Sequence, residues 1–187
     1  VNHKRAEGDD VIAALVHYLQ DNETTTGGIF DEPQEILLVS SDSDFKQFHK
    51  FKNFKQFNPI MKKWVAKPEE DFLIDKIIRG DAGDGVPSVL CPDDFFVNED
   101  TGRAPPVTKK VIERFKNGLG LTEEEKRRFE RNRLMIDLSL TPTDIRDEIV
   151  ANYKTADATC DLQKIMNHLI QKRCRNLLND VQAFKTT

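Results

Sequence analysis

Residues 35–44 read Glu35-Ile-Leu-Leu-Val-Ser-Ser-Asp-Ser-Asp44, a short and almost wholly apolar run that ends in two acids. Such runs are typical of buried parallel strands, so we predict a central strand over residues 35–41. Asp42 and Asp44 follow its carboxyl end, where open α/β sheets position ligands and catalytic groups. The same Asp-Ser-Asp pattern also suits an Asx turn before the next helix, and the sequence leaves both interpretations open.

Seven acidic residues fall in three short clusters, each placed where one element of structure is expected to meet the next. They are Glu7, Asp9 and Asp10; Asp42 and Asp44; and Asp81 and Asp84. The first cluster opens a helix expected over residues 6–20, and the third lies in a glycine-rich loop after a helix expected over residues 69–79. Each cluster alone is compatible with helix-dipole compensation or a solvated loop. Gathered in one small domain, these carboxylates need a divalent cation or raised pKa values, which predicts Mg²⁺ and phosphate chemistry.

The rest of the chain predicts a mixed α/β core with a helical C-terminal lobe. A helical turn over 44–49 and a hairpin of strands 54–58 and 63–66 follow the first strand. Phe recurs every third residue from 45 to 57 with lysines between. This repeat suits base stacking, but we favour burial in the core. Further helices are expected from Thr122, which opens a capping box with Glu125, and over 143–153 and 161–184, the last one broken in its middle.

Composition indicates an ordinary globular chain. It has 187 residues, 38% of them hydrophobic and 32% charged, and a net charge of −4. No apolar run approaches the roughly 20 residues that a spanning helix requires, and nothing resembles a signal peptide, so we expect a cytoplasmic location. The cysteines at 91, 160 and 174 support neither a disulfide framework nor a zinc site. Basic residues gather apart from the acids, as expected where a metal pocket must also hold a phosphate backbone.

Three motifs together resemble the structure-specific 5′ nucleases, the flap endonuclease and 5′–3′ exonuclease family. They are Glu7-x-Asp9-Asp10, Ser41-Asp42-x-Asp44-Phe45 and Gly80-Asp81-x-x-Asp84-x-Val86-Pro87. Within this family the chain resembles the bacteriophage T4 ribonuclease H type, over the C-terminal two-thirds of that protein. The resemblance implies a truncated PIN-like core with a parallel central sheet and a small hairpin. It also implies two domains: the C-terminal part of the catalytic core at 1–88, and a helical DNA-binding lobe at 89–187.

The resemblance also implies roles for the acids. Asp9 and Asp42 would contribute to one Mg²⁺ shell and Asp44 and Asp84 to a second, these four being catalytic, with Mn²⁺ as an alternative ion. Glu7, Asp10 and Asp81 would support the metals. The basic residues expected to contact nucleic acid are Lys62, Lys63, Lys109, Lys110 and Arg114.

For the activity, the family implies cleavage near 5′ ends in DNA flaps and in RNA paired with DNA. In a phage this serves primer removal during DNA replication, in the cytoplasm of the infected host. A single-stranded-DNA-binding protein is the implied protein partner, and a monomer is expected. The chain begins at Val1 and lacks the part that supplies further aspartates in the family, so we expect a piece of a longer protein with an incomplete site. An insert at 89–106 replaces the family's compact phosphate-gripping hairpin.

Other functions stay open. A strand that ends in Asp-x-Asp also opens the site of haloacid-dehalogenase phosphatases, but position 46 is Lys where those enzymes need Thr or Val. An EF-hand is disfavoured, because its loop glycine and final glutamate are missing. A non-catalytic chain that only binds nucleic acid is the stronger alternative.

Overall fold

The computed structural model describes residues 1, 3–22, 34–98, 102–156 and 161–184. Cys160 and part of the insert, residues 99–101, lie outside them. The chain forms two compact units, Val1–Asn152 and Tyr153–Thr187, and each is described by itself. In the described residues, no helix is long and apolar enough to cross a membrane.

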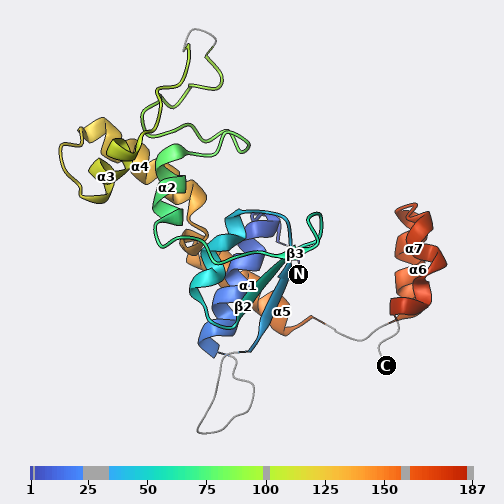
Figure 1. Cartoon of the computed structure of the whole chain (residues 1–187). Coiled ribbons are helices and arrows are strands. Elements are labelled where there is room, and N and C mark those ends of the chain that lie inside the picture. The colour runs from blue at the N-terminus through green and yellow to red at the C-terminus, as the bar shows by residue number, and fades with distance from the viewer. Residues whose placement is uncertain (2, 23–33, 99–101, 157–160, 185–187) are drawn as a thin grey trace, which may run out of the picture. The chain divides into compact units, whose positions relative to one another are not determined.

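A three-stranded sheet lies in the first unit (Figure 1). It consists of β1 (Ile36–Val39), β2 (Phe54–Asn58) and β3 (Lys63–Trp64), in that order. β1 and β2 are parallel, and β2 and β3 form an antiparallel hairpin. The side chain of Asn58 shapes the hairpin turn, because its Oδ1 accepts hydrogen bonds from the amides of Ile60 and Met61 at 3.0 and 2.9 Å. The predicted hairpin is confirmed, with its second strand shorter than the expected residues 63–66, and β1 and β2 supply the parallel part of the sheet.

The position of β1 differs from the prediction. In the described part of the sheet β2 is central and β1 lies at the edge. Leu37 and Val39 are each 59% exposed, while Ile36 and Leu38 pack against the core. The apolar run was expected to be buried on both faces, but only one face of β1 is covered by described residues.

The covered face of the sheet packs on α1 (Gly8–Asn22) and η1 (Asp44–Lys50). Their shared core contains Ala13, Val16, Phe45, Phe48 and Phe54, all buried. The rings of Phe48 and Phe54 meet edge to face, with centroids 5.6 Å apart. These three phenylalanines of the repeat therefore form core and are not free to stack on bases.

A second core joins α2 (Phe72–Arg79), α3 (Lys109–Lys116) and α4 (Glu123–Ile136), which lie together in Figure 1. Ile78 and Phe115 are among its buried residues. The capping box of Thr122 and Glu125 is present at the start of α4, as predicted. η3 (Leu138–Leu140) and α5 (Thr143–Lys154), up to Asn152, complete this unit.

The second unit holds three short elements, α6 (Leu162–Gln171), α7 (Arg175–Asn179) and η4 (Val181–Phe184). Asp161 caps α6, because its Oδ1 accepts hydrogen bonds from the amides of Gln163 and Lys164. The helix ends at Gln171, and Arg173 just beyond it has a left-handed φ of 56°. This is the predicted break within residues 161–184.

Candidate metal centre

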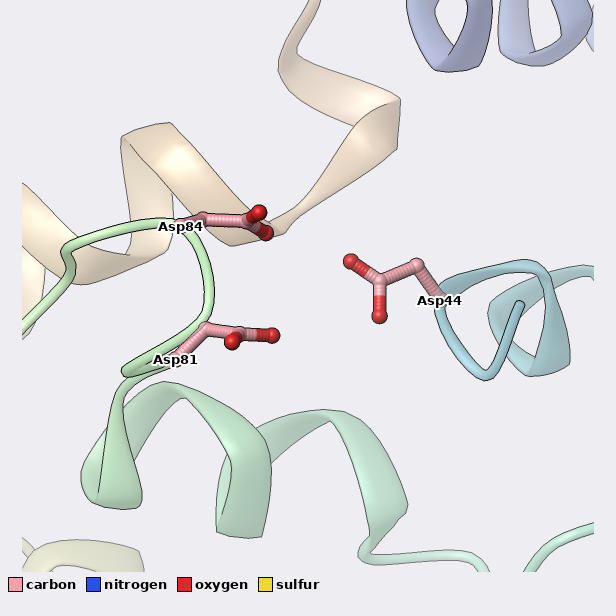
Figure 2. Close-up of side chains that lie close together, drawn as sticks. All are labelled: Asp44, Asp81 and Asp84. Atoms are coloured by element: carbon pink, nitrogen blue, oxygen red, sulfur yellow. The ribbon is translucent and has the colours of Figure 1, made fainter.

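Three carboxylates from two distant segments meet in the first unit. Asp44 lies at the start of η1, and Asp81 and Asp84 lie in the loop after α2. Each offers one oxygen such that the three oxygens lie within 4.8 Å of one another. Figure 2 shows the carboxylates of Asp81 and Asp84 directed from their loop toward that of Asp44. The second and third acidic clusters of the sequence therefore converge.

Asp44 is positioned by an Asx turn. Oδ1 of Asp42 accepts a hydrogen bond from the amide of Asp44 at 2.9 Å, and the carbonyl of Asp42 accepts one from Nε2 of Gln56 at 2.7 Å. Gln56 is 1% exposed, so this contact ties the turn to the central strand. The sequence left a turn and a metal site as alternatives for Asp42-Ser-Asp44. The structure contains the turn, and the turn directs Asp44 toward the other acids.

The loop that carries Asp81 and Asp84 is held by its own backbone. Asp81 and Val86 exchange two backbone hydrogen bonds of 2.8 and 2.7 Å, and the amide of Gly83 donates to Oδ1 of Asp81 at 3.0 Å. The loop begins at Gly80 with φ of 72°, and a Cβ there would lie 2.4 Å from the carbonyl oxygen of Val86. Only glycine fits this position, because a side chain meets both strain and a backbone clash.

A buried amide fixes the loop to the helices around it. Nδ2 of Asn132 in α4 donates to the carbonyls of Ile77 and Pro87, both at 2.9 Å, and Asn132 is fully buried. These two carbonyls lie on either side of the acidic loop. Asn132 therefore holds both ends of the loop against α4.

A lysine that the sequence analysis did not single out lies among the three acids. Nζ of Lys76 contacts Oδ1 of Asp44 and lies 2.9 Å from Oδ2 of Asp81. The Lys76 hydrogen bond is the main reason that the pKa of Asp81 is lowered, against the opposing effect of burial. The sequence signal was slight: a lysine in the last turn of a helix, five positions before Asp81.

The first acidic cluster lies beside the same site. A cavity of about 410 Å³ is lined by five acids, Glu7, Asp9, Asp10, Asp44 and Asp84, together with Arg5 and apolar residues of the α4–η3 region. Burial raises the pKa of Asp9, and repulsion from Asp42, Glu7, Asp10 and Asp84 raises it further. All three clusters therefore act on one another electrostatically.

Asp10 has a local structural task within this cluster. Its Oδ2 accepts a hydrogen bond from the amide of Glu7 at 3.1 Å, and its Oδ1 accepts one from the hydroxyl of Thr141 at 2.9 Å. Asp10 thus closes the turn before α1 and ties it to the segment before α5.

The comparisons with known proteins bear directly on this geometry. A family model described as T4 RNase H, C terminal, matches residues 66–184. The chain belongs to the T4 RNase H family. It is 33% identical over 187 residues to ribonuclease H of Enterobacteria phage T4, an alignment that covers 95% of this chain and 58% of that protein. The resemblance predicted from the three motifs is confirmed, although the chain spans somewhat less of its relative than the two-thirds expected.

The five basic residues expected to contact nucleic acid differ in their exposure and in their partners. Lys62, Lys63, Lys109 and Lys110 are exposed. The guanidinium of Arg114 is partly buried and pairs with Glu125, whose carboxylate also accepts a hydrogen bond from the amide of Thr122 in the capping box of α4. Arg114 therefore links α3 to α4, and the four lysines are the freer cations.

The donor chemistry of the site fits the hard divalent ions. Carboxylate oxygens are the ligands that Mg²⁺ and Mn²⁺ prefer, and no thiol or imidazole lies in the group formed by Asp44, Asp81 and Asp84. In octahedral Mg²⁺ coordination, oxygens at about 2.1 Å from the metal lie at most about 4.2 Å apart. A small inward movement of the three side chains would bring their oxygens within this span.

Proposed function

We propose that this chain forms the metal-binding part of a Mg²⁺-dependent 5′ nuclease, which hydrolyses phosphodiesters near the 5′ ends of DNA flaps and RNA–DNA hybrids. The observation that carries the proposal is the meeting of acids from three distant segments around one cavity. Membership of the T4 RNase H family supports nuclease chemistry at this site, because the relative in phage T4 is named a ribonuclease H.

The acids divide into three groups with different tasks. Asp44 and Asp84, with Asp81 beside them, would hold one ion, and Asp9 and Asp42 would contribute to a second. Glu7 and Asp10 shape the edge of the cavity. Two bound metal ions would supply an activated water and neutralise charge on the phosphate. The protein's own contribution is to keep five carboxylates at one cavity despite their repulsion, which the hydrogen bonds of Asp10, Asp42 and Asp81 make possible.

The substrate would lie across exposed positive charge. Lys62 and Lys63 at the hairpin, and Lys109 and Lys110 at the start of α3, are exposed and suited to contact a phosphate backbone. On this proposal residues 1–88 belong to a PIN-like catalytic core and residues 89–187 to a DNA-binding lobe. The setting is primer removal in phage DNA replication, in the host cytoplasm, with a single-stranded-DNA-binding protein as partner.

A second candidate is binding of branched nucleic acid without cleavage. One observation favours it: the chain spans 58% of the length of the T4 ribonuclease H that it matches. Residues beyond that share would then be needed for hydrolysis but not for retention of DNA.

A titration of Mg²⁺ with a labelled 5′-flap substrate separates these functions. A nuclease releases the flap only when Mg²⁺ is present, whereas a binder retards the substrate in a gel and leaves it intact. Phage T4 ribonuclease H serves as the positive control. A chain that neither cuts nor retards the flap, but hydrolyses a phosphate monoester, contradicts both candidates and points to a phosphatase.

A further inference from the structure

We infer that Lys76 is the internal counter-ion of the metal centre: its ammonium group holds Asp44 and Asp81 together when no divalent ion is bound, and it withdraws when one binds. The inference rests on the proposed function, because it concerns the ion that this function requires. It assigns to Lys76 control over how tightly the site binds metal.

The first support is the burial of this ion pair. The side chain of Lys76 is 12% exposed, and those of its partners Asp44 and Asp81 are 16% and 26% exposed. Four other lysines that form ion pairs are more open, from 29% exposure for Lys116 to 78% for Lys164, with Lys126 and Lys55 between them. A buried lysine is costly unless its charge is matched, so Lys76 is held in place by the acids themselves.

The second support is its position. Lys76 bridges two acids from different segments, Asp44 at the start of η1 and Asp81 in the loop after α2. Both acids also belong to the group of three whose oxygens lie within 4.8 Å of one another. The ammonium group thus lies against two of the three carboxylates that a divalent ion would use.

Repulsion between the Lys76 ammonium group and a divalent ion explains why Lys76 would withdraw when metal binds. An ammonium group in contact with a ligand oxygen would lie within about 5 Å of a divalent ion on that oxygen, and repulsion between a single and a double positive charge at this distance is strong. Lys76 has the means to withdraw. Its neighbours Ile77 and Ile78 are buried and anchor α2, but the ammonium is carried on a flexible four-carbon stem. The helix can therefore stay fixed while the charge moves away.

An opposite role for Lys76 gives an opposite prediction. If Lys76 were a permanent support that keeps Asp44 and Asp81 in place while metal is bound, its removal would weaken metal binding. If it is a counter-ion that competes with the metal, its removal tightens metal binding and destabilises the metal-free protein. Metal affinity therefore distinguishes the two roles.

The experiment measures Mn²⁺ binding to the 187-residue chain by electron paramagnetic resonance. We expect Lys76→Met to bind Mn²⁺ on the order of tenfold more tightly than the wild type. Its melting temperature without metal should fall and should recover when Mn²⁺ is added. Lys76→Arg keeps the charge and should bind no more tightly than the wild type. Lys116→Met is the matched control, because Lys116 pairs with Asp71 away from the three acids, and it should leave the affinity within about twofold.

The outcomes separate this inference from the proposed function. Equal or weaker Mn²⁺ binding by Lys76→Met, with normal binding by the wild type, overturns the role of Lys76 and leaves the metal centre standing. Absence of Mn²⁺ binding in both proteins overturns the metal centre, and the inference with it.

A second measurement covers the case in which Lys76→Met does not fold. In wild-type protein labelled with ¹³C-lysine, the Lys76 side-chain resonance, assigned by its loss in Lys76→Arg, should move on addition of Mg²⁺. A resonance that stays in place while Mg²⁺ binds overturns the inference.

Discussion

The hydroxyl of Thr141 donates a 2.9 Å hydrogen bond to Oδ1 of Asp10, and this contact joins the first acidic cluster to the segment before α5. Thr141 is 8% exposed, so the bond is shielded from water. Asp10 also accepts a hydrogen bond from the amide of Glu7. Both carboxylate oxygens of Asp10 therefore accept hydrogen bonds from the protein. This gives Asp10 a structural role, whereas its neighbour Asp9 is proposed as a metal ligand.

The first prediction follows from this contact. Thr141→Val should lower the free energy of unfolding by about 1 kcal/mol, because it removes a shielded hydrogen bond to a charged group. Asp10→Asn should be destabilising to a similar degree and should leave Mn²⁺ affinity within about threefold of the wild type. Chemical denaturation and Mn²⁺ titration measure the two effects. A loss of metal binding in Asp10→Asn as large as that in Asp44→Asn would show that Asp10 is a ligand.

The second prediction concerns the acids assigned to the metals. Asp42→Asn or Asp84→Asn should lower flap cleavage at least about 100-fold, because each removes a ligand from the proposed centre, and should leave retention of DNA unchanged. Cleavage is measured with the labelled 5′-flap substrate, and metal binding by Mn²⁺ titration of the same variants. The matched control is Asp93→Asn, since Asp93 pairs with Arg127 and Arg131 outside the centre. Full activity of the Asp42→Asn, Asp84→Asn double variant would refute the site.

The third prediction tests the loop that carries Asp81 and Asp84. Gly80→Ala should destabilise the protein by about 2–4 kcal/mol, because it combines a left-handed backbone with a clash against Val86. Gly85→Ala is a matched control, since Gly85 has the same φ of 72° but nothing within 4 Å of an added Cβ. It should cost only the backbone strain, about 1–2 kcal/mol. Thermal unfolding compares them, and equal losses would show that the predicted clash is relieved by movement of the loop.

The fourth prediction concerns pH. Burial and neighbouring acids raise the pKa of Asp9 above its ordinary value of 3.8, so ionised Asp9 destabilises the metal-free folded state. This penalty is fully present above the raised pKa and fades as the pH falls through it toward 3.8. Asp9→Asn should therefore stabilise the metal-free protein at pH 7, on the order of 0.5 kcal/mol after allowance for screening.

The stabilisation should disappear as the pH falls through the raised pKa of Asp9 toward 3.8, because Asp9 of the wild type then takes up a proton. Thermal unfolding in the presence of a chelator, at a series of pH values, measures it. With Mn²⁺ present the order should reverse, because the wild type then gains stability from an ion that Asp9→Asn binds less well. An Asp9→Asn variant that is less stable than the wild type at pH 7 without metal would contradict the account of Asp9.

Local signals predicted much of the fold. The capping box at Thr122, the hairpin turn at Asn58 and the break before α7 depend on residues close in sequence, and each is present in the structure. The sequence was misleading about β1. An apolar run of four or five residues indicates a strand but not what covers its two faces, and Leu37 and Val39 are exposed in the described chain.

The candidate site was also predicted only in part, because local patterns show where acids lie in the sequence but not how distant elements pack. Acids at the ends of elements were visible as clusters, and the structure brings Asp44 to Asp84 as expected. The position of Lys76 was not predictable, because it depends on how α2 packs against η1, which no local pattern specifies. The same holds for Arg114, whose partner Glu125 lies on a different helix.

The bond between Asp10 and Thr141 joins positions 131 residues apart, and Gln47 reaches 89 residues ahead to the carbonyl of Ile136. Contacts of such long range form late in folding, because the loop that they close is entropically costly. During synthesis, the acidic cavity would thus stay open until the ribosome has released nearly all of the first unit. A nascent chain would thus carry the acids of all three clusters before their centre is ordered, because Asp10 finds its partner only once Thr141 has left the ribosome.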